Sequence, residues 1–142
     1  MKSEPKHLLV INDTPAILQV FRDLFEDEGF RVTVDTFSSF DSGTKFHEIT
    51  ALCPDVIILD FLIGGEPLGW QLLQLLRMSR ETAKIPIVVC SAAVRQMEEL
   101  GAHLLTLGVQ VVLKPFEIDD AIAAVHRALG NVGVTLTDAL AS

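Results

Sequence analysis

The sequence predicts an α/β fold, a doubly wound (βα)5 sandwich around a five-stranded parallel sheet. Three observations predict it. Short apolar runs alternate five times with segments of helical periodicity. Most of these runs are apolar throughout, which is typical of parallel strands covered by helices on both faces. Several of them end in a polar residue, at the sheet edge where open α/β folds bind ligands.

The first strand and helix have clear sequence signals. Leu8–Ile11 is a short apolar run and is expected to be a buried strand. Thr14 and Pro15 open a helix, because threonine is a good N-cap and proline suits the first turn. Gly29 is expected to end this helix. Its apolar residues recur at helical spacing; they are Ile17, Leu18, Phe21, Leu24 and Phe25.

The middle of the chain continues the alternation. Residues 31–37 alternate in polarity, which indicates a strand with one wetter face. A helix is expected over about 40–52, where the helical pattern is the weakest in the chain. Pro54 ends that helix, and Val56–Leu59 is a fully apolar strand followed by Asp60.

The remaining elements follow the same order. A helix marked by Met97, Leu100 and Leu104 is broken near Gly108. The single domain is expected to cover residues 1–130, with 131–142 as a short tail and no output domain. The other predicted elements are a helix at 68–80, a strand at 85–90, a strand at 109–113 and a helix at 117–129.

The polarity of the strands predicts their order. The first, third and fourth runs are the most uniformly apolar and should be central, whereas the second alternates and should lie at an edge. The order 2-1-3-4-5, with right-handed crossovers, satisfies this requirement. The first and third strands are then neighbours at the switch point, so Asp13 and Asp60 should lie side by side.

Composition excludes several classes of protein. Hydrophobic residues make up 49% of the 142 residues, which argues against disorder. With 11 Lys and Arg against 19 Asp and Glu, the net charge of −8 does not suit nonspecific binding to nucleic acid or anionic lipid. Two cysteines, Cys53 and Cys90, make no disulfide framework. No signal peptide or membrane-spanning run is present, so a cytoplasmic protein is expected.

Four polar side chains at the predicted strand ends suggest phosphoryl chemistry. Adjacent carboxylates at Asp13 and Asp60 repel each other unless a cation lies between them, and oxygen ligands at an accessible edge suit Mg²⁺. Lys114 adds a positive charge and Ser91 a hydroxyl. An aspartate can act as a nucleophile and form an aspartyl-phosphate, whose oxygens the cation, lysine and hydroxyl would hold. Asp60 is the better nucleophile because its strand is central.

At these residues the chain resembles the receiver domains of response regulators in two-component signalling, over about residues 6–130. The resemblance implies a flavodoxin-like fold and phosphorylation of Asp60 by a histidine kinase or a histidine phosphotransfer protein. Each motif alone is weak, but together and in this order they are specific. The matching segments are VINDTP at 10–15, PDVIILD at 54–60, Gly69, IPIVVCSA at 85–92 and LKPF at 113–116.

The resemblance also implies a Mg²⁺ site. Asp13 and Asp60 would be direct ligands, and Leu62 would contribute its backbone carbonyl. Asn12 stands where the family usually has a second acid, and could act through a metal-bound water. Because the change from acid to amide removes about one negative charge, weaker Mg²⁺ binding is expected.

The resemblance assigns the remaining site residues to phosphoryl binding and switching. Lys114 takes the lysine position, followed by Pro115 in a bond that is usually cis in the family. Ser91 takes the position of the switch hydroxyl. Val111 stands where the family often has an aromatic ring that rotates inward on activation. Valine cannot report the state in that way, so switching is expected either to run through backbone shifts of the loop after Ser91 or to be muted.

Two apolar residues predict slow loss of the phosphoryl group. Leu62 and Ala93, two residues past Asp60 and Ser91, flank the phosphoryl site in the family. Neither side chain can orient a hydrolytic water, so slow self-dephosphorylation is expected. The chain is not expected to be an enzyme beyond catalysing its own phosphorylation and dephosphorylation.

Other functions were weighed against this one. A phosphorylation-independent interaction module stays open, because Asn12 and Val111 depart from the family pattern. A haloacid-dehalogenase-type phosphatase needs a D-x-D pair after the first strand, which Asn12-Asp13-Thr14 lacks. A flavodoxin-like cofactor binder needs a phosphate loop there, and this segment has no glycine. Output is expected through partner binding or onward phosphotransfer, and a homodimer through the fourth helix, fifth strand and fifth helix stays open.

Overall fold

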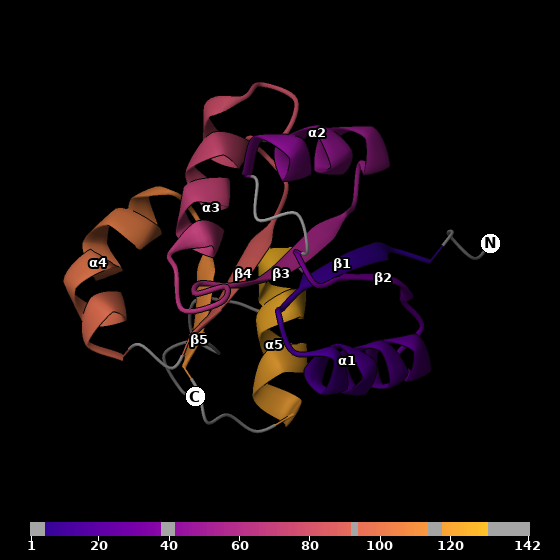
Figure 1. The fold of residues 1–142 in the computed structure, drawn as a ribbon. Coiled ribbons are helices and arrows are strands. Elements are labelled where there is room, and N and C mark those ends of the chain that lie inside the picture. Colours follow the sequence, from indigo (N-terminus) through magenta and orange to yellow (C-terminus); the bar gives the residue numbers. More distant parts are fainter. Residues whose placement is uncertain (1–4, 38–41, 92–93, 114–117, 131–142) are drawn as a thin grey trace.

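The computed structural model describes residues 5–37, 42–91, 94–113 and 118–130 (Figure 1). Strands and helices alternate along the chain, in the order predicted from the sequence. The strands are β1 (His7–Ile11), β2 (Arg31–Asp35), β3 (Val56–Asp60), β4 (Ile87–Ser91) and β5 (Gln110–Leu113). The helices are α1 (Pro15–Asp27), α2 (Ser42–Leu52), α3 (Leu68–Met78), α4 (Val94–Thr106) and α5 (Ile118–Ala128).

The strands form one parallel sheet in the order β2-β1-β3-β4-β5, which confirms the predicted order 2-1-3-4-5. Every residue of β1, β3 and β4 is buried, whereas β2 is partly exposed. The apolar runs are therefore central because helices cover both of their faces, and the alternating run lies at an edge.

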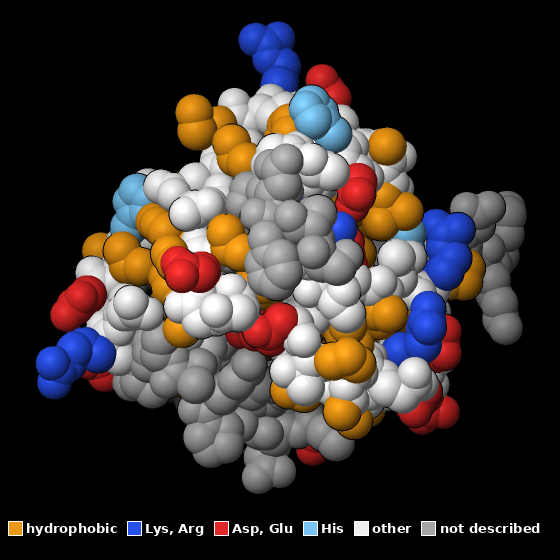
Figure 2. Space-filling model, viewed as in Figure 1, with side chains coloured by type: hydrophobic (Ala, Val, Ile, Leu, Met, Phe, Trp, Pro, Cys, Tyr) orange, Lys and Arg blue, Asp and Glu red, His pale blue; other side chains and the backbone are white. Residues whose placement is uncertain are grey.

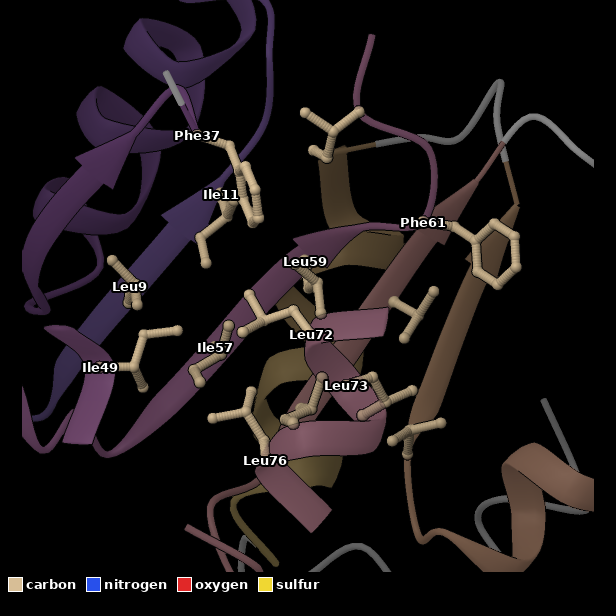
Figure 3. Packing of buried hydrophobic residues seen from close by; sticks show 14 of the residues in the cluster. Leu9, Ile11, Phe37, Ile49, Ile57, Leu59, Phe61, Leu72, Leu73 and Leu76 are labelled. Atoms are coloured by element: carbon tan, nitrogen blue, oxygen red, sulfur yellow. The ribbon is translucent and has the colours of Figure 1, made fainter. Parts of the chain in front are cut away.

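Helices cover both faces of the sheet (Figure 1). Alternate residues of each strand point to opposite faces, so Leu8 and Val10 pack with α1 and α5, while Leu9 and Ile11 pack on the other face. That other face carries α2, α3 and α4. Figure 3 shows this layer, in which the side chains of β3 meet those of α3; the labelled residues there include Ile57, Leu59, Leu72, Leu73 and Leu76.

The start of α1 differs from the prediction in one detail. Pro15 occupies the first turn as expected, but the Thr14 side chain makes no capping hydrogen bond. Instead, the Oδ1 atom of Asn12 accepts the Thr14 N–H at 2.8 Å, and the Thr14 carbonyl accepts the N–H groups of Ile17 and Leu18. The side chain of Asn12, and not that of Thr14, thus holds the turn into α1.

The predicted second strand ends two residues early, at Asp35. Phe37 is fully buried and has a backbone φ of 60°, a value that residues other than glycine rarely adopt. Its N–H donates to Oδ1 of Asp35 at 2.7 Å, which turns the chain away from the sheet. Other predicted elements end within a few residues of those observed, because helix and strand ends depend on local hydrogen bonds.

The surface charges, the helices and the cysteines of the described residues can each be compared with what the composition predicts. On the face shown in Figure 2, the described Lys and Arg side chains lie in separate places. Within the described residues, no helix combines the length and the apolar character that a membrane span needs. Cys53 and Cys90 are free thiols, and Cys90 is a buried core residue.

Candidate functional site

The strand register brings three predicted site residues together at the carboxyl edge of the sheet. Ile11 pairs with Leu59, so the next residues, Asn12 and Asp60, end neighbouring strands. Asp60 in turn pairs with Cys90, the residue before Ser91. Asp60 and Ser91 are both buried, at 6% and 1% exposure. The central position predicted for Asp60 is therefore correct.

Asp13 and the end of β5 lie next to this row. Asp13 follows Asn12 and is exposed to solvent. Leu113 pairs with Ser91, so β5 also ends at this edge. Lys114 and Pro115, which come next, lie outside the described residues, as does Ala93.

Asn12 is held by two hydrogen bonds. Its backbone N–H donates to the Asp35 carbonyl at 3.1 Å, and its Oδ1 accepts the Thr14 N–H. The side chain is 3% exposed. Because an amide oxygen has two lone pairs, one acceptor site remains on Oδ1. Contact with a metal-bound water thus stays a prediction, and the observed role of this residue is to hold the turn into α1.

The two carboxylate oxygens of Asp13 have different surroundings. Oδ2 accepts the backbone N–H of Gly64 at 2.7 Å. Among the residues that the structure describes, Oδ1 has only a long contact, 3.4 Å, with the hydroxyl of Thr14. One oxygen is therefore fixed by the loop after β3, and the other keeps acceptor capacity at the solvent-accessible edge. Carboxylate oxygens in this setting are ligands that Mg²⁺ prefers.

The loop after β3 is built as a tight turn. Ile63 and Glu66 exchange two backbone hydrogen bonds, of 2.8 and 3.0 Å, across Gly64 and Gly65. Both glycines have positive φ, 60° and 80°. This turn was not predicted from the sequence, although two adjacent glycines are its usual signal.

Gly69 sits in the first turn of α3, against the backbone of the site. A Cβ atom there would lie 1.9 Å from the carbonyl oxygen of Asp60 and 2.8 Å from that of Phe61. No side chain fits at this distance. The glycine recognised in the sequence thus lets α3 approach the end of β3.

An ion-pair cluster next to the site escaped the sequence analysis. The Nζ atom of Lys45, in α2, lies 2.8 Å from carboxylate oxygens of both Asp35 and Glu48, and 5.9 Å from the centre of the Phe37 ring. Burial lowers the pKa of Lys45, but the hydrogen bonds and charges of the two acids outweigh it and leave the pKa raised. The helical pattern of α2 is weak, so no sequence signal marked this lysine.

The switch position on β5 carries an aliphatic side chain with partial exposure. Val111 packs against the core layer beneath α2, α3 and α4. On the same side of the sheet, the ring of Trp70 in α3 lies 5.9 Å from that of Phe61 and 5.5 Å from that of His103 in α4. Trp70 is thus a packing residue between two helices.

The donor set at the edge fits a hard cation. Asp13 and Asp60 would supply carboxylates from the ends of adjacent strands, and Leu62 would supply a backbone carbonyl from the loop between β3 and α3. All are oxygen ligands, as Mg²⁺ requires. Among the residues that the structure describes, three or more His, Cys, Asp or Glu side chains nowhere gather in one cluster, so a site rich in nitrogen or sulfur ligands has no counterpart there.

Comparison with known proteins identifies the family to which this fold belongs. The model of the response regulator receiver domain family matches residues 8–126. The chain belongs to the response regulator receiver family. As a receiver domain of a two-component system, it has the fold expected from its sequence, and the match includes Asp13, Asp60, Ser91 and Lys114.

Among curated relatives, the response regulator SaeR of Staphylococcus aureus (strain USA300) is 27% identical over 124 residues. The alignment covers 87% of this chain and 50% of SaeR. This receiver chain therefore spans about half the length of the curated relatives it matches.

Solved receiver domains share the fold. The receiver domain of the Francisella response regulator 1452 has a TM-score of 0.71 and 27% identity, over 88% of this chain and 97% of that one. The receiver domain of the sensor histidine kinase PA1611 from Pseudomonas aeruginosa has a TM-score of 0.71 and 19% identity, over 89% and 99%. That structure holds a magnesium ion in its active site cleft.

Proposed function

We propose that this receiver domain is a Mg²⁺-dependent phosphoacceptor in a cytoplasmic phosphorelay, with Asp60 as the acceptor. The register of β1, β3 and β4 carries the proposal, because it puts Asp60 beside the end of β1 on one side and Ser91 on the other. The magnesium ion in the PA1611 receiver domain supports the same chemistry.

Each side chain has a definite part in the proposed transfer. An Asp60 carboxylate oxygen attacks the phosphorus of a phosphohistidine on a kinase or phosphotransfer protein, and the P–N bond breaks as the imidazole leaves. The Ser91 hydroxyl and the Lys114 ammonium group bind the phosphoryl oxygens. These contacts stabilise charge that develops during transfer.

The residues that would hold Mg²⁺ are Asp13, Asp60 and the carbonyl of Leu62, with Asn12 acting through water. When bound there, the ion neutralises the repulsion between the two carboxylates and the incoming phosphoryl group. Binding is expected to be weak, since Asn12 brings no charge and its oxygen already accepts the Thr14 N–H.

The domain would act on no separate substrate. It catalyses its own phosphorylation and slow dephosphorylation, and it signals by binding a partner protein or by passing the phosphoryl group on. Slow dephosphorylation follows from the apolar side chain of Leu62, which is only partly exposed and offers a hydrolytic water no polar group. A half-life of seconds for the purified phosphoprotein would contradict this part of the proposal.

A second candidate is a receiver domain that binds its partner independently of phosphorylation. One observation favours it: the Asn12 side chain serves the turn into α1, at a position where the family usually has an acid. The valine at position 111 is consistent with it, because it offers no ring to report the phosphorylated state.

Incubation with Mg²⁺ and acetyl phosphate or phosphoramidate, followed by intact-mass spectrometry, separates the two candidates. The wild type is expected to gain one phosphoryl mass, and Asp60→Ala none. Asp119→Asn, which changes an exposed carboxylate in α5, serves as the control and should label like the wild type. Absence of labelling across a wide range of Mg²⁺ concentrations would exclude the phosphoacceptor and favour the independent module.

A further inference from the structure

The turn after β3 directs a backbone N–H group toward Asp13, which follows β1. Gly64 and Gly65 occupy its two central positions with positive φ, as the tight hairpin turn between Ile63 and Glu66 requires. In this conformation the N–H of Gly64 reaches Oδ2 of Asp13 at 2.7 Å. The two residues are 51 positions apart, so the bond joins the end of β1 to the β3–α3 loop.

The hydrogen bond from Gly64 to Asp13 is short and involves a charged acceptor. A backbone N–H that donates to a carboxylate makes a short, charge-assisted hydrogen bond, and 2.7 Å is at the short end of the usual range. The Thr14 hydroxyl on the other carboxylate oxygen is 3.4 Å away and holds it much less firmly. The Gly64 amide is therefore the group that sets the orientation of the Asp13 carboxylate.

The same turn also controls a second ligand of the proposed metal site. Leu62 directly precedes Ile63, whose N–H and carbonyl close the turn. The direction of the Leu62 carbonyl is thus coupled to the geometry of the turn. One short loop would hold both Asp13, through the Gly64 N–H, and the Leu62 carbonyl.

We propose that the Gly64-Gly65 turn is a positioning element for the metal site, and that it orients Asp13 through the Gly64 amide so that Oδ1 is presented to Mg²⁺. This inference rests on the proposed function, since it assumes that Asp13 is a metal ligand. Fixing a ligand before binding reduces the ordering that binding must otherwise impose. Groups that orient metal ligands in this way typically change metal affinity by about 10- to 100-fold.

A matched pair of glycine variants tests the proposal. Gly65→Val puts a β-branched residue at a φ of 80°, which the turn cannot keep without strain. Gly29→Val introduces the same kind of strain at a φ of 95°, at the opposite edge of the sheet. A Cβ atom at either position has no neighbour within 4 Å, so both variants act through the backbone and not through a clash.

The measurement is a Mg²⁺ titration followed by amide NMR spectra of the full chain. Gly65→Val is expected to weaken Mg²⁺ binding about tenfold, whereas Gly29→Val should bind like the wild type. Gly65→Asn, which tolerates positive φ, should keep most of the affinity and so exclude a general effect of substitution. Equal or tighter Mg²⁺ binding by Gly65→Val would overturn the proposal.

A metal-free measurement distinguishes this proposal from the proposed function. The Gly64 amide resonance should lie downfield in the wild type and move upfield in Asp13→Ala, because the acceptor is lost. An unchanged Gly64 resonance in Asp13→Ala would show that the bond is not formed, and would overturn the positioning role alone. If Asp13→Ala moves the Gly64 resonance but the wild type binds no Mg²⁺, the hydrogen bond exists without a metal site. That result would overturn both the Mg²⁺-dependent phosphoacceptor function and the positioning role of the turn.

Discussion

The backbone of Gly69 packs directly on the carbonyl group of Asp60, the residue at the centre of the site. A Cβ atom on Gly69 would lie 1.9 Å from the Asp60 oxygen, far inside van der Waals contact. The start of α3 and the end of β3 thus share one closely packed backbone contact. Any side chain at position 69 must displace one of these two segments.

Gly69→Ala is therefore expected to lower the free energy of unfolding by about 1 to 3 kcal/mol, the usual cost of overpacking, although alanine favours helices. Urea unfolding measures the difference. Gly101→Ala, in α4, is the control, because a Cβ atom there has no neighbour within 4 Å. The control should be neutral or slightly stabilising, and equal behaviour of the two variants would contradict the packing argument.

Lys45→Met tests the ion-pair cluster beside the site. Lys45 is 5% exposed, and its removal leaves Asp35 near the core without its cation. Because the Asp35 side chain is still 23% exposed, the expected loss is about 1 to 3 kcal/mol, below that for a fully buried pair. Glu48→Gln should cost about 0 to 1 kcal/mol, since that carboxylate is half exposed. Thermal unfolding that ranks the two variants in the reverse order would count against this account.

The side chain of Arg77 joins three segments. Its Nε donates to the Leu107 carbonyl after α4, and its Nη1 donates to the Ile85 carbonyl before β4, both at 2.8 Å. Arg77→Met leaves both carbonyls without this donor and is expected to cost about 1 to 3 kcal/mol. Arg80→Met, at an exposed position of the same region, should have little effect on urea unfolding. A similar loss in both variants would argue that charge, and not the two bonds, is responsible.

His7 should make the stability depend on pH. Burial lowers its pKa, as does the charge of Arg31, although Asp55 opposes them, and its Nε2 lies 2.7 Å from the Thr33 hydroxyl. Unfolded His7 takes up a proton near pH 6.5, where folded His7 stays neutral, so the unfolded state binds more protons. The contribution of His7 to stability is therefore full above about pH 6.5 and falls as the pH drops below it.

Chemical unfolding at pH 5.5 and 7.5 measures this contribution. His7→Gln is expected to lose less stability than the wild type between the two pH values, because one source of proton uptake is gone. If His7→Gln and the wild type lose the same amount, His7 is not the titrating group.

Trp70 can report the contact between α3 and α4. It is the single tryptophan of a chain without tyrosine, and its ring lies 5.5 Å from that of His103 in an edge-on arrangement. His103→Leu is expected to change the intensity and position of Trp70 emission. His126→Leu is the control, since His126 packs near Phe30 on the other face of the sheet. Identical emission from His103→Leu and the wild type would mean that the two rings do not meet in solution.

The order of the elements and of the strands was predictable from sequence, because the burial of a strand determines its pattern of apolar residues. A strand covered on both faces has to be apolar throughout, as in Val56–Leu59, and an edge strand such as β2 alternates. That difference predicted the neighbours of β3, and with them that the ends of β1, β3 and β4 lie side by side. The ends of elements were less predictable: the Thr14 side chain was expected to cap α1, but the Thr14 carbonyl accepts the N–H groups of Ile17 and Leu18, and the Asn12 side chain holds the turn.

Contacts between segments far apart in the chain produce no such pattern in the sequence. The bond from Gly64 to Asp13 joins residues 51 positions apart, and the donor is a backbone group that every residue except proline possesses. The pairing of Lys45 with Asp35 and the two bonds of Arg77 likewise depend on where helices settle against the sheet. Periodicity records which side of an element is buried. Which atoms meet there is decided by packing in three dimensions, and in this receiver domain that packing orients the carboxylate of Asp13.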